Sequence, residues 1–251
     1  MAGAMGCPGM TRMLVTRPEP DAQTTVAKLA ALDIEAVAAP LMVRQTLPVS
    51  LPPPDGFQAI VFTSANGIRA LADRGVLDQY LHLPVFAVGD RTARDAEAAG
   101  FQRVSSAAGG LQDLVNAISL SGVRGPLFHA TGKHQSGDLA QALAPSGVMV
   151  VTAKLYDMVA EPSLPPAILD ALGADISAVL LYSRRTAEIF VDVTRDLEPE
   201  RRRRLGLLCL AEQVAEPLLG ARFGRIGLAD RPDEDAMMAL ALAFAREQTG
   251  P

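Results

Sequence analysis

Short apolar runs that alternate with helical patterns most constrain the fold of this 251-residue chain. Several runs are apolar at successive positions, which indicates that both faces of each run are buried. Such runs are typical of parallel strands covered by helices on both sides, so we predict an α/β fold with open parallel sheets. The predicted strands are Met13–Thr16, Ala36–Ala39, Ala59–Thr63, Val85–Val88, Leu127–Ala130, Val148–Ala153, Ala178–Tyr182, Leu207–Leu210 and Arg225–Leu228.

The order of these predicted elements occurs twice along the chain. The segment Met13–Met42 reads as a strand, a polar turn, a helix and a second strand, and Leu127–Tyr156 repeats this order. A second type of segment begins with Phe57–Leu71 and recurs from Ile176–Phe190. A repeated order of elements at low identity indicates duplication of one structural unit, so we predict two similar α/β domains.

Proline placement predicts where the chain crosses between these two domains. Pro-rich stretches at residues 40–54 and 162–166 follow the two copies of the first segment, and such stretches are extended and semi-rigid. In contrast, Ser119–Gly125 is a connection short enough to stay inside one domain. We therefore predict a continuous domain over residues 45–158 and a discontinuous domain from residues 1–44 and 159–251. Two extended linkers would join them, with the functional site in the cleft between the domains.

Charge and apolar patterning argue against nucleic-acid and membrane partners. The net charge is −5 and tryptophan is absent, whereas nucleic-acid binders usually present a basic field and stacking rings. The basic run Arg201–Arg204 follows two glutamates and is typical of a solvated helix end or loop. No stretch approaches the about 18 apolar residues that span a bilayer, and the first twelve residues lack the apolar core of a signal peptide. We expect a cytoplasmic protein.

The sequence also lacks the patterns of metal, nucleotide and nucleophile sites. Two cysteines and the histidines His82, His129 and His134 show no metal-ligand spacing, so we expect no metal. No glycine-rich phosphate loop follows a predicted strand, and no G-x-S-x-G motif occurs, so we expect no cofactor. An enzyme of this composition must act mainly by holding its substrate in position.

Polar and cationic side chains follow the carboxyl ends of several predicted strands. Ligands bind beyond these ends in open α/β sheets. Each of these polar residues could simply cap the helix that follows it. Together, however, several helix N-termini with cations nearby would attract an anion. We therefore predict a site for a small polyanion. The candidate binding residues are Arg17, Thr63, Ser64, Asn66, Gly89, Arg91, Thr92, Lys133, Ser183 and Arg184.

Six strings in this order resemble the uroporphyrinogen-III synthase family: VTRP, VFTSANGIRAL, FAVGDRTARDAEAAGF, KLYDM, VLLYSRRTAEIF and CLAEQVAEPL. The resemblance covers the chain from about Thr11 onwards and implies the same discontinuous two-lobed fold. It further implies a lyase-type, dehydrating cyclisation in heme and other tetrapyrrole biosynthesis. The family closes hydroxymethylbilane into uroporphyrinogen III with inversion of ring D, and it uses no metal or organic cofactor.

The resemblance also assigns roles to single residues. Tyr156 falls at a linker tyrosine that faces the cleft in the family and is thought to assist departure of the substrate hydroxyl; the alternative is a packed ring with a wet hydroxyl tip. Ser64, Thr92 and Ser183 fall at turns that imply binding of substrate carboxylates. Arg17 matches an arginine common at the end of the first strand. The implied partner is the substrate hydroxymethylbilane, with a transient contact to the preceding pathway enzyme.

Two departures from the family pattern leave an alternative function open. The second copy of a Gly-x-x-Thr turn is Ala211–Val214, which lacks the hydroxyl, and Glu212 would repel a carboxylate unless it points away. Thr131-Gly132-Lys133 stands where many members have an Arg-Gly turn. The alternative is a non-catalytic, two-lobed regulatory protein that binds a tetrapyrrole or another anion. No long apolar stripe lacks a core position, so we expect a monomer.

Overall fold

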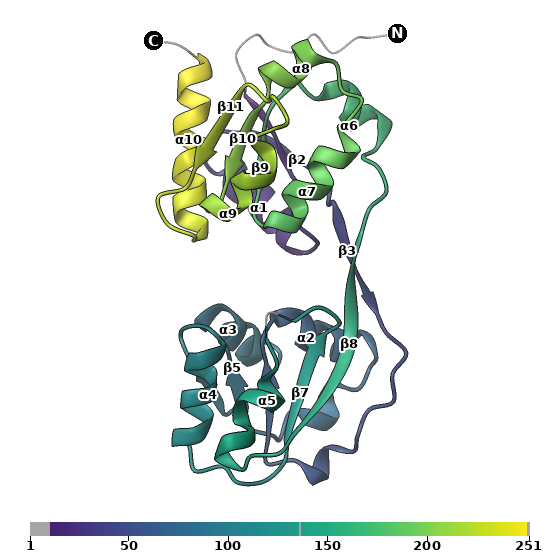
Figure 1. Cartoon of the computed structure of the whole chain (residues 1–251), viewed down its shortest axis with the longest axis vertical. Helices are drawn as coiled ribbons and strands as arrows, with labels where there is room; N and C mark the ends of the chain where they lie inside the picture. The colour runs from purple at the N-terminus through teal and green to yellow at the C-terminus, as the bar shows by residue number, and fades with distance from the viewer. Residues whose placement is uncertain (1–10, 136, 250–251) are drawn as a thin grey trace. The chain divides into compact units, whose positions relative to one another are not determined.

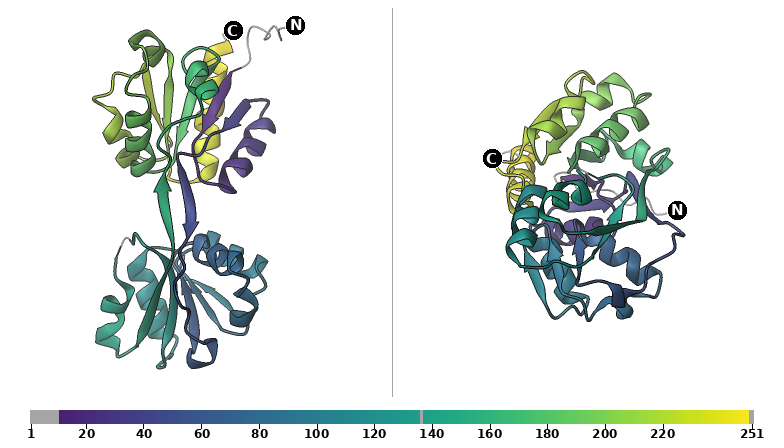
Figure 2. Two further views of the ribbon diagram at one scale, coloured as in Figure 1. Left: turned by 90° about the vertical axis from the view of Figure 1, so that its right-hand side faces the viewer. Right: turned by 60° about the horizontal axis from the view of Figure 1, so that its bottom comes forward.

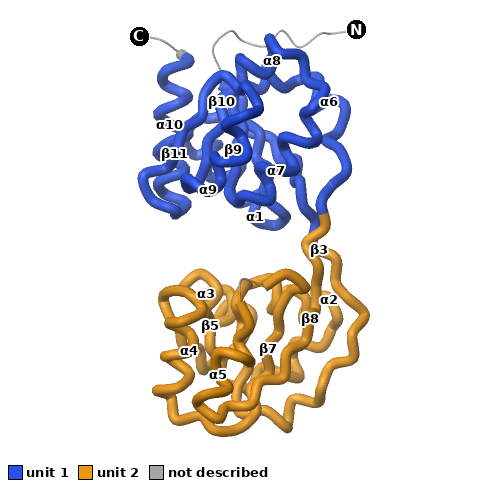
Figure 3. The backbone as a smooth tube through the Cα atoms, in the orientation of Figure 1, with its two compact units in different colours: residues 1–43, 160–251 blue, residues 44–159 orange. Residues whose placement is uncertain are grey.

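The computed structural model describes residues 11–135 and 137–249 (Figure 1). The first ten residues, on which the expected lack of a signal peptide partly depends, lie outside the described residues. Figures 1 and 2 show helices on both faces of two separate sheets. The chain divides into two compact units (Figure 3). Unit 1 contains the described residues up to Val43 and from Ala160 onwards, and unit 2 contains Arg44–Val159.

The predicted α/β class with parallel sheets is confirmed. In unit 1 the strand order is β11-β10-β9-β1-β2, and each neighbouring pair is parallel. Its strands are β1 (Arg12–Val15), β2 (Glu35–Ala38), β9 (Ile176–Leu181), β10 (Gly206–Cys209) and β11 (Arg225–Leu228). Its helices are α1 (Asp21–Ala30), α6 (Pro166–Ala171), α7 (Arg184–Val193), α8 (Pro199–Arg204), α9 (Glu212–Ala215) and α10 (Glu234–Thr249), with a 3₁₀ turn at Glu216–Leu218.

The sheet assigned to unit 2 has the order β3-β8-β7-β4-β5-β6, and the pairs from β8 to β6 are parallel. Its strands are β3 (Met42–Thr46), β4 (Ala59–Phe62), β5 (Val85–Ala87), β6 (Val104–Ser106), β7 (Leu127–Gly132) and β8 (Val150–Ala160). Its helices are α2 (Ala65–Asp73), α3 (Asp90–Ala98), α4 (Leu111–Leu120) and α5 (Leu139–Leu143), with 3₁₀ turns at Pro54–Gly56, Leu77–Tyr80 and Ala144–Ser146.

The two sheets have equivalent strand orders. Unit 2 read as β6-β5-β4-β7-β8 matches unit 1 read as β11-β10-β9-β1-β2, with each strand at the position its repeat predicts. All nine predicted strands are present, with ends that differ by up to seven residues. β3 and β6 were missed because they are edge strands in which most side chains are polar or partly exposed. β8 was predicted to end at Ala153 but continues to Ala160.

Successive apolar residues in the central strands separate onto two faces, as the sequence predicts. In unit 1, Leu14 joins a core with Val179 on one face, whereas its neighbour Val15 joins another core with Leu180 on the opposite face. In unit 2, Ile60 and Val61 divide in the same way. Burial on both faces contributes roughly 1.5–3 kcal/mol per large side chain, which stabilises a sheet covered by helices.

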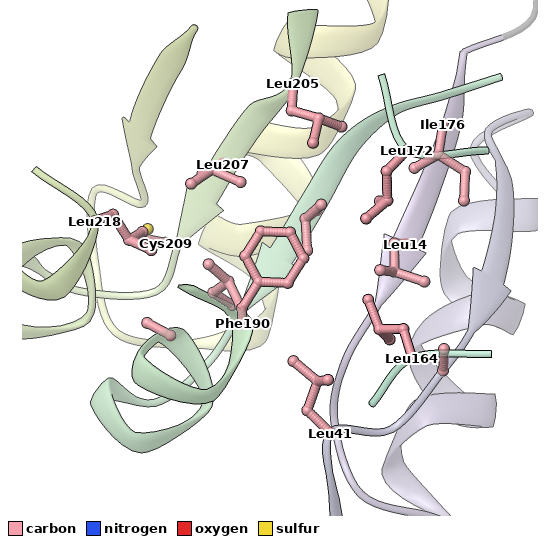
Figure 4. Packing of buried hydrophobic residues seen from close by; sticks show 14 of the residues in the cluster. Leu14, Leu41, Leu164, Leu172, Ile176, Phe190, Leu205, Leu207, Cys209 and Leu218 are labelled. Carbon is pink, nitrogen blue, oxygen red and sulfur yellow. The ribbon is translucent and has the colours of Figure 1, made fainter. Parts of the chain in front are cut away.

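Helix α7 closes one face of the unit 1 sheet with a single large side chain. Phe190 projects from α7 among Leu14, Leu207 and Cys209, and all four side chains are fully buried (Figure 4). Cys209 therefore acts as a small apolar residue, as predicted. Its burial raises the pKa of the thiol to about 12, so the reactive thiolate is suppressed at neutral pH.

The basic run Arg201–Arg204 ends helix α8, but two of its side chains are not simply solvated as predicted. The Arg201 guanidinium donates hydrogen bonds to backbone carbonyl oxygens of Leu169 and Leu172, at 2.5 and 2.9 Å. Arg202 likewise donates to Thr194 O at 2.6 Å. Carbonyl groups at helix ends lack hydrogen-bond donors within their own helix, and the guanidinium groups of these arginines provide such donors.

The chain crosses between the units at residues 43–44 and 159–160, which lie in β3 and β8. The first predicted linker, residues 40–54, contains one crossing, and the second, residues 162–166, follows the other, but the prolines themselves lie inside the units. In unit 2, Tyr80 Oη donates to Pro52 O at 2.7 Å, and Arg74 donates to Leu47 O at 2.7 Å. In unit 1, Pro165 and Pro166 begin α6. These prolines therefore shape packing within each unit.

Candidate functional site

Unit 2 contains a pocket at the carboxyl ends of its central strands. The parallel register pairs Val61 of β4 with His129 of β7, so the polar residues that follow these positions meet at one edge of the sheet. This is where ligands bind in open α/β sheets. The pocket has a volume of about 330 Å³. Its lining residues are Thr63, Ser64, Val88, Gly110, Leu111, His129, Thr131, His134, Gln135, Gly137 and Tyr156.

Tyr156 reaches this pocket from β8 through an irregularity in the sheet. The β7–β8 register shifts between Thr131 and Gly132, and this shift places Gly132 opposite Tyr156. A Cβ atom at Gly132 would lie 2.7 Å from Tyr156 Cε2, so only glycine leaves room for the ring. The glycine of the divergent Thr131-Gly132-Lys133 turn therefore has a structural reason.

The Tyr156 side chain is 7% exposed, and its phenol is protonated at neutral pH. Burial raises the pKa of Tyr156, while a hydrogen bond with Ser64 and the positive charge of Arg44 oppose that rise. A neutral phenol can donate its proton to a bound group. The geometry is compatible with both roles considered for Tyr156, since the ring is packed and the hydroxyl is beside the pocket.

Thr63 and Ser64 line the pocket at the junction of β4 and α2. Ser64 is the N-cap residue of α2, and its Oγ accepts a hydrogen bond from Asn66 N at 3.2 Å. The N-terminal end of α2 carries the positive end of the helix dipole, and its Asn66 and Gly67 N–H groups donate to Ser64. Capping and pocket lining therefore coexist at Ser64, as the sequence allowed.

His129 lines the same pocket and was not among the predicted site residues. It is 1% exposed on β7, and its Nε2 lies 3.3 Å from Thr63 Oγ1. Burial lowers the pKa of His129 to about 4, against the opposing charge of Asp138, so the imidazole is neutral near pH 7. The sequence signal was a polar residue inside the apolar run Leu127–Ala130, because a buried polar group needs a partner.

Five other predicted residues of unit 2 lie near strand ends but do not line this pocket. Asn66 Oδ1 accepts a hydrogen bond from Arg69 at 3.2 Å, and Lys133 Nζ lies 3.0 Å from Asp157 Oδ2. The remaining three begin helix α3: Gly89 is its N-cap residue, Arg91 is exposed and Thr92 is buried. A role of these five residues in carboxylate binding stays a prediction.

Arg17 of unit 1 is held in an internal network. Its guanidinium lies 2.5 Å from Glu234 Oε2 and donates to Thr25 Oγ1 at 3.1 Å. The same group lies over the Tyr182 ring, 4.1 Å from its centroid. Burial and the charge of Glu234 raise the pKa of Tyr182 to about 12. A substrate carboxylate would have to compete with Glu234 for Arg17, so the predicted contact remains untested.

Ser183 and Arg184 also have partners inside unit 1. Ser183 is the N-cap residue of α7, and its Oγ accepts a hydrogen bond from Thr186 N at 3.1 Å. Arg184 pairs with Glu188 at 3.0 Å and with Glu216. Their predicted roles in substrate binding are likewise untested by these contacts.

The divergent turn at Ala211–Val214 is built for packing. Val214 is 2% exposed and belongs to a hydrophobic core of unit 1. Ala211 is the N-cap residue of the four-residue helix α9, where no side chain caps the helix. This second copy of the turn therefore has no hydroxyl to offer a ligand.

Within the described part of the chain, no group of three or more histidine, cysteine, aspartate or glutamate side chains could hold a metal ion. Across the same residues, no helix combines the length and apolar character needed to cross a membrane. The polar lining of the pocket includes the hydroxyls of Thr63 and Ser64, the phenol of Tyr156 and the neutral imidazole of His129, which bind by hydrogen bonding.

Comparisons with known proteins connect this chain and its fold to one family. A family model described as HEM4, Uroporphyrinogen-III synthase HemD, matches residues 23–239. The crystal structure of uroporphyrinogen-III synthetase from Helicobacter pylori 26695 is similar, with a TM-score of 0.66 and 17% identity over 94% of this chain and 100% of that chain. A mutant uroporphyrinogen III synthase from the extremely thermophilic bacterium Thermus thermophilus has a TM-score of 0.47 and 17% identity over 94% and 98%. No curated protein matches the chain by sequence.

Proposed function

This chain belongs to the uroporphyrinogen-III synthase family, and we propose that it cyclises hydroxymethylbilane to uroporphyrinogen III with inversion of ring D. Family membership supports an enzyme of porphyrin biosynthesis. The observation that best supports the detailed reaction is one shared pocket: the phenol of Tyr156 lies with the hydroxyls of Thr63 and Ser64 at the edge of the unit 2 sheet.

The pocket chemistry suits a substrate with carboxylate side chains. An ionised carboxylate accepts hydrogen bonds and donates none, so its site must supply donors. The hydroxyls of Thr63 and Ser64 can supply them on one side of the pocket, beside the positive end of the α2 dipole. If several of its carboxylates are bound, the flexible linear substrate loses conformational freedom. Closure through the unsubstituted carbon of ring D is then disfavoured.

In the proposed reaction Tyr156 is the proton donor. Its phenol gives a proton to the terminal hydroxyl of the substrate, the carbon–oxygen bond breaks towards oxygen, and water leaves. The lone pair of the adjacent pyrrole nitrogen forms a double bond towards the methylene carbon, which gives a protonated azafulvene. Attack by the substituted carbon of ring D on this methylene forms a spiro intermediate. The bond from the spiro carbon to the methylene between rings C and D then breaks, and that methylene bonds to the unsubstituted carbon of ring D, so ring D is reversed. The proton lost as the final pyrrole regains aromaticity returns to Tyr156, so the sum is the loss of one water.

The test supplies hydroxymethylbilane to the full chain and separates the uroporphyrinogen isomers. The proposal expects mainly isomer III. Isomer I alone, which forms without enzyme, would contradict it. Tyr156→Phe in the same assay then asks whether the phenol takes part.

A second function is favoured by the unit 1 contacts. Val214 offers no hydroxyl and Arg17 is paired with Glu234, so unit 1 contributes fewer obvious ligand contacts than the sequence suggested. Under this alternative the chain binds a tetrapyrrole or another anion and regulates a partner without catalysis. Tight binding of hydroxymethylbilane or uroporphyrinogen III, with no gain in isomer III, would support it.

A further inference from the structure

Thr63 lies between two polar side chains of the neighbouring strand. Its Oγ1 is 3.3 Å from His129 Nε2 and 3.5 Å from Thr131 Oγ1. His129 and Thr131 are two residues apart on β7, so both point to the same side of the sheet, and both are buried. Thr63 itself is only partly buried and lines the pocket. The Thr63 hydroxyl therefore connects a buried imidazole to a site open to a ligand.

The two ring nitrogens of His129 have different surroundings. Nε2 faces Thr63, whereas Nδ1 is buried and has no hydrogen-bond partner among the described residues. A neutral imidazole carries its proton on one nitrogen only. A proton on Nδ1 would leave a buried N–H without an acceptor, and such orphaned donors are rare in folded proteins. A proton on Nε2 is instead donated to Thr63 Oγ1.

We propose that His129 is a positioning residue that donates a hydrogen bond from Nε2 to Thr63 Oγ1 and thereby turns the Thr63 proton towards a substrate carboxylate. A hydroxyl that accepts from Nε2 keeps its own proton free. Thr131 Oγ1, at 3.5 Å, is at the outer limit of hydrogen bonding and competes weakly for that proton. The inference rests on the proposed function, because it names how one binding group of that site is oriented.

His129 itself does not take part in the chemistry under this proposal. The residue is 1% exposed, and its Nε2 lies 3.3 Å from Thr63 Oγ1. The opposite proton placement would make Thr63 a donor to His129, and Thr63 would then present only lone pairs to the ligand. Those lone pairs would repel a carboxylate, so the direction of one hydrogen bond decides whether the pocket favours an anion.

Three substitutions separate orientation from simple packing. His129→Gln can place an amide N–H where Nε2 stood, whereas His129→Asn places one nearer the Nδ1 position. His129→Phe removes both ring nitrogens and therefore the N–H donor. We expect KM for hydroxymethylbilane to rise about tenfold in the Phe and Asn variants, with kcat within about twofold of the parent. The Gln variant should restore most of the affinity. Equal KM values for the Gln, Asn and parent chains would overturn the proposal.

The proton position is also directly measurable in the full chain without turnover. Nitrogen-15 labelling of histidine and NMR at pH 7 report which ring nitrogen carries the proton. Substitution of the two exposed histidines, His82 and His134, in turn assigns the remaining signals to His129. The proposal expects the Nε2–H form, and an Nδ1–H form would overturn it even where the variants unfold. Failure to form isomer III would instead contradict the proposed function and leave this measurement intact.

Discussion

The ring of Tyr156 lies against Gly132 on the adjacent strand, so closely that any Cβ atom at residue 132 would come within 2.7 Å of Tyr156 Cε2. The register shift between Thr131 and Gly132 creates this contact. Packing of the ring and exposure of its hydroxyl to the pocket thus depend on one residue without a side chain.

Gly132→Ala should displace the Tyr156 ring and lower kcat by about tenfold or more, because a proton donor that moves by an ångström loses its alignment. We also expect a loss of stability of about 1–3 kcal/mol from overpacking. Urea unfolding and initial rates measure the two effects. Gly56→Ala is the matched control in the same unit, because a Cβ atom there meets nothing within 4 Å. A Gly132→Ala chain with the parent rate would contradict the proposed role of the contact.

Tyr156→Phe should lower kcat about tenfold, which corresponds to about 1.4 kcal/mol on the barrier, while the fold is retained. The loss is modest because positioning should provide most of the catalysis. The control is Tyr80→Phe, since the Tyr80 hydroxyl donates to Pro52 O away from the pocket. That control should lose about 1 kcal/mol of stability and none of the activity. An unchanged kcat for Tyr156→Phe would exclude the proton-donor role.

The buried His129 should make the folded state sensitive to acid. Burial lowers its pKa to about 4 in the folded chain, with Asp138 opposing, against about 6.5 when unfolded. Between these values the unfolded state binds a proton that the folded state excludes, so stability falls as the pH drops from about 6.5 to 4.

Across this pH range the free energy of unfolding should fall by about 3 kcal/mol because of His129. Urea unfolding at pH 7.5, 5.5 and 4.5 should show a steeper loss for the parent than for His129→Leu. Carboxylates titrate alike in both chains, so only the difference between them reports on His129. Parallel pH profiles would show that the imidazole is protonated in the folded chain.

Arg17 is expected to stabilise unit 1 rather than to bind substrate. Its side chain is 11% exposed and pairs with Glu234, which is 22% exposed. Breaking such a partly buried pair should cost about 2 kcal/mol, between the values for exposed and buried pairs. Arg17→Leu and Glu234→Gln should therefore lose similar stability and keep the parent KM. A rise in KM for Arg17→Leu but not for Glu234→Gln would instead support the substrate contact that was predicted from the place of Arg17 after β1.

The fold was largely predictable because its signals are local. Leu14 and Val15 are both apolar, and burial on opposite faces of a sheet explains why. In contrast, β6 was missed, since Ser105 and Ser106 are exposed and join the sheet only through backbone pairing with β5. The Pro-rich stretches were predicted as extended linkers, but Pro166 begins α6, and carbonyls of the first stretch accept hydrogen bonds from Arg74 and Tyr80, which no local pattern connects to them.

The site was only partly predictable because its contacts join distant strands. Thr63 and Ser64 were named from their place after a strand and Tyr156 from the family resemblance, and the register of β4, β7 and β8 brings them to one pocket. His129 was missed because its importance depends on Thr63, which lies on another strand. Arg17 was named as a cation at a strand end, and its pair with Glu234 of the last helix could not be predicted because the two residues are far apart in the sequence.

The most direct test of the proposed function is the isomer ratio formed from hydroxymethylbilane within the first minutes, before the spontaneous reaction consumes it. We predict that the full chain converts the substrate mainly to uroporphyrinogen III, in proportion to the protein added. A product that remains isomer I at every protein concentration would contradict the function proposed for this pocket.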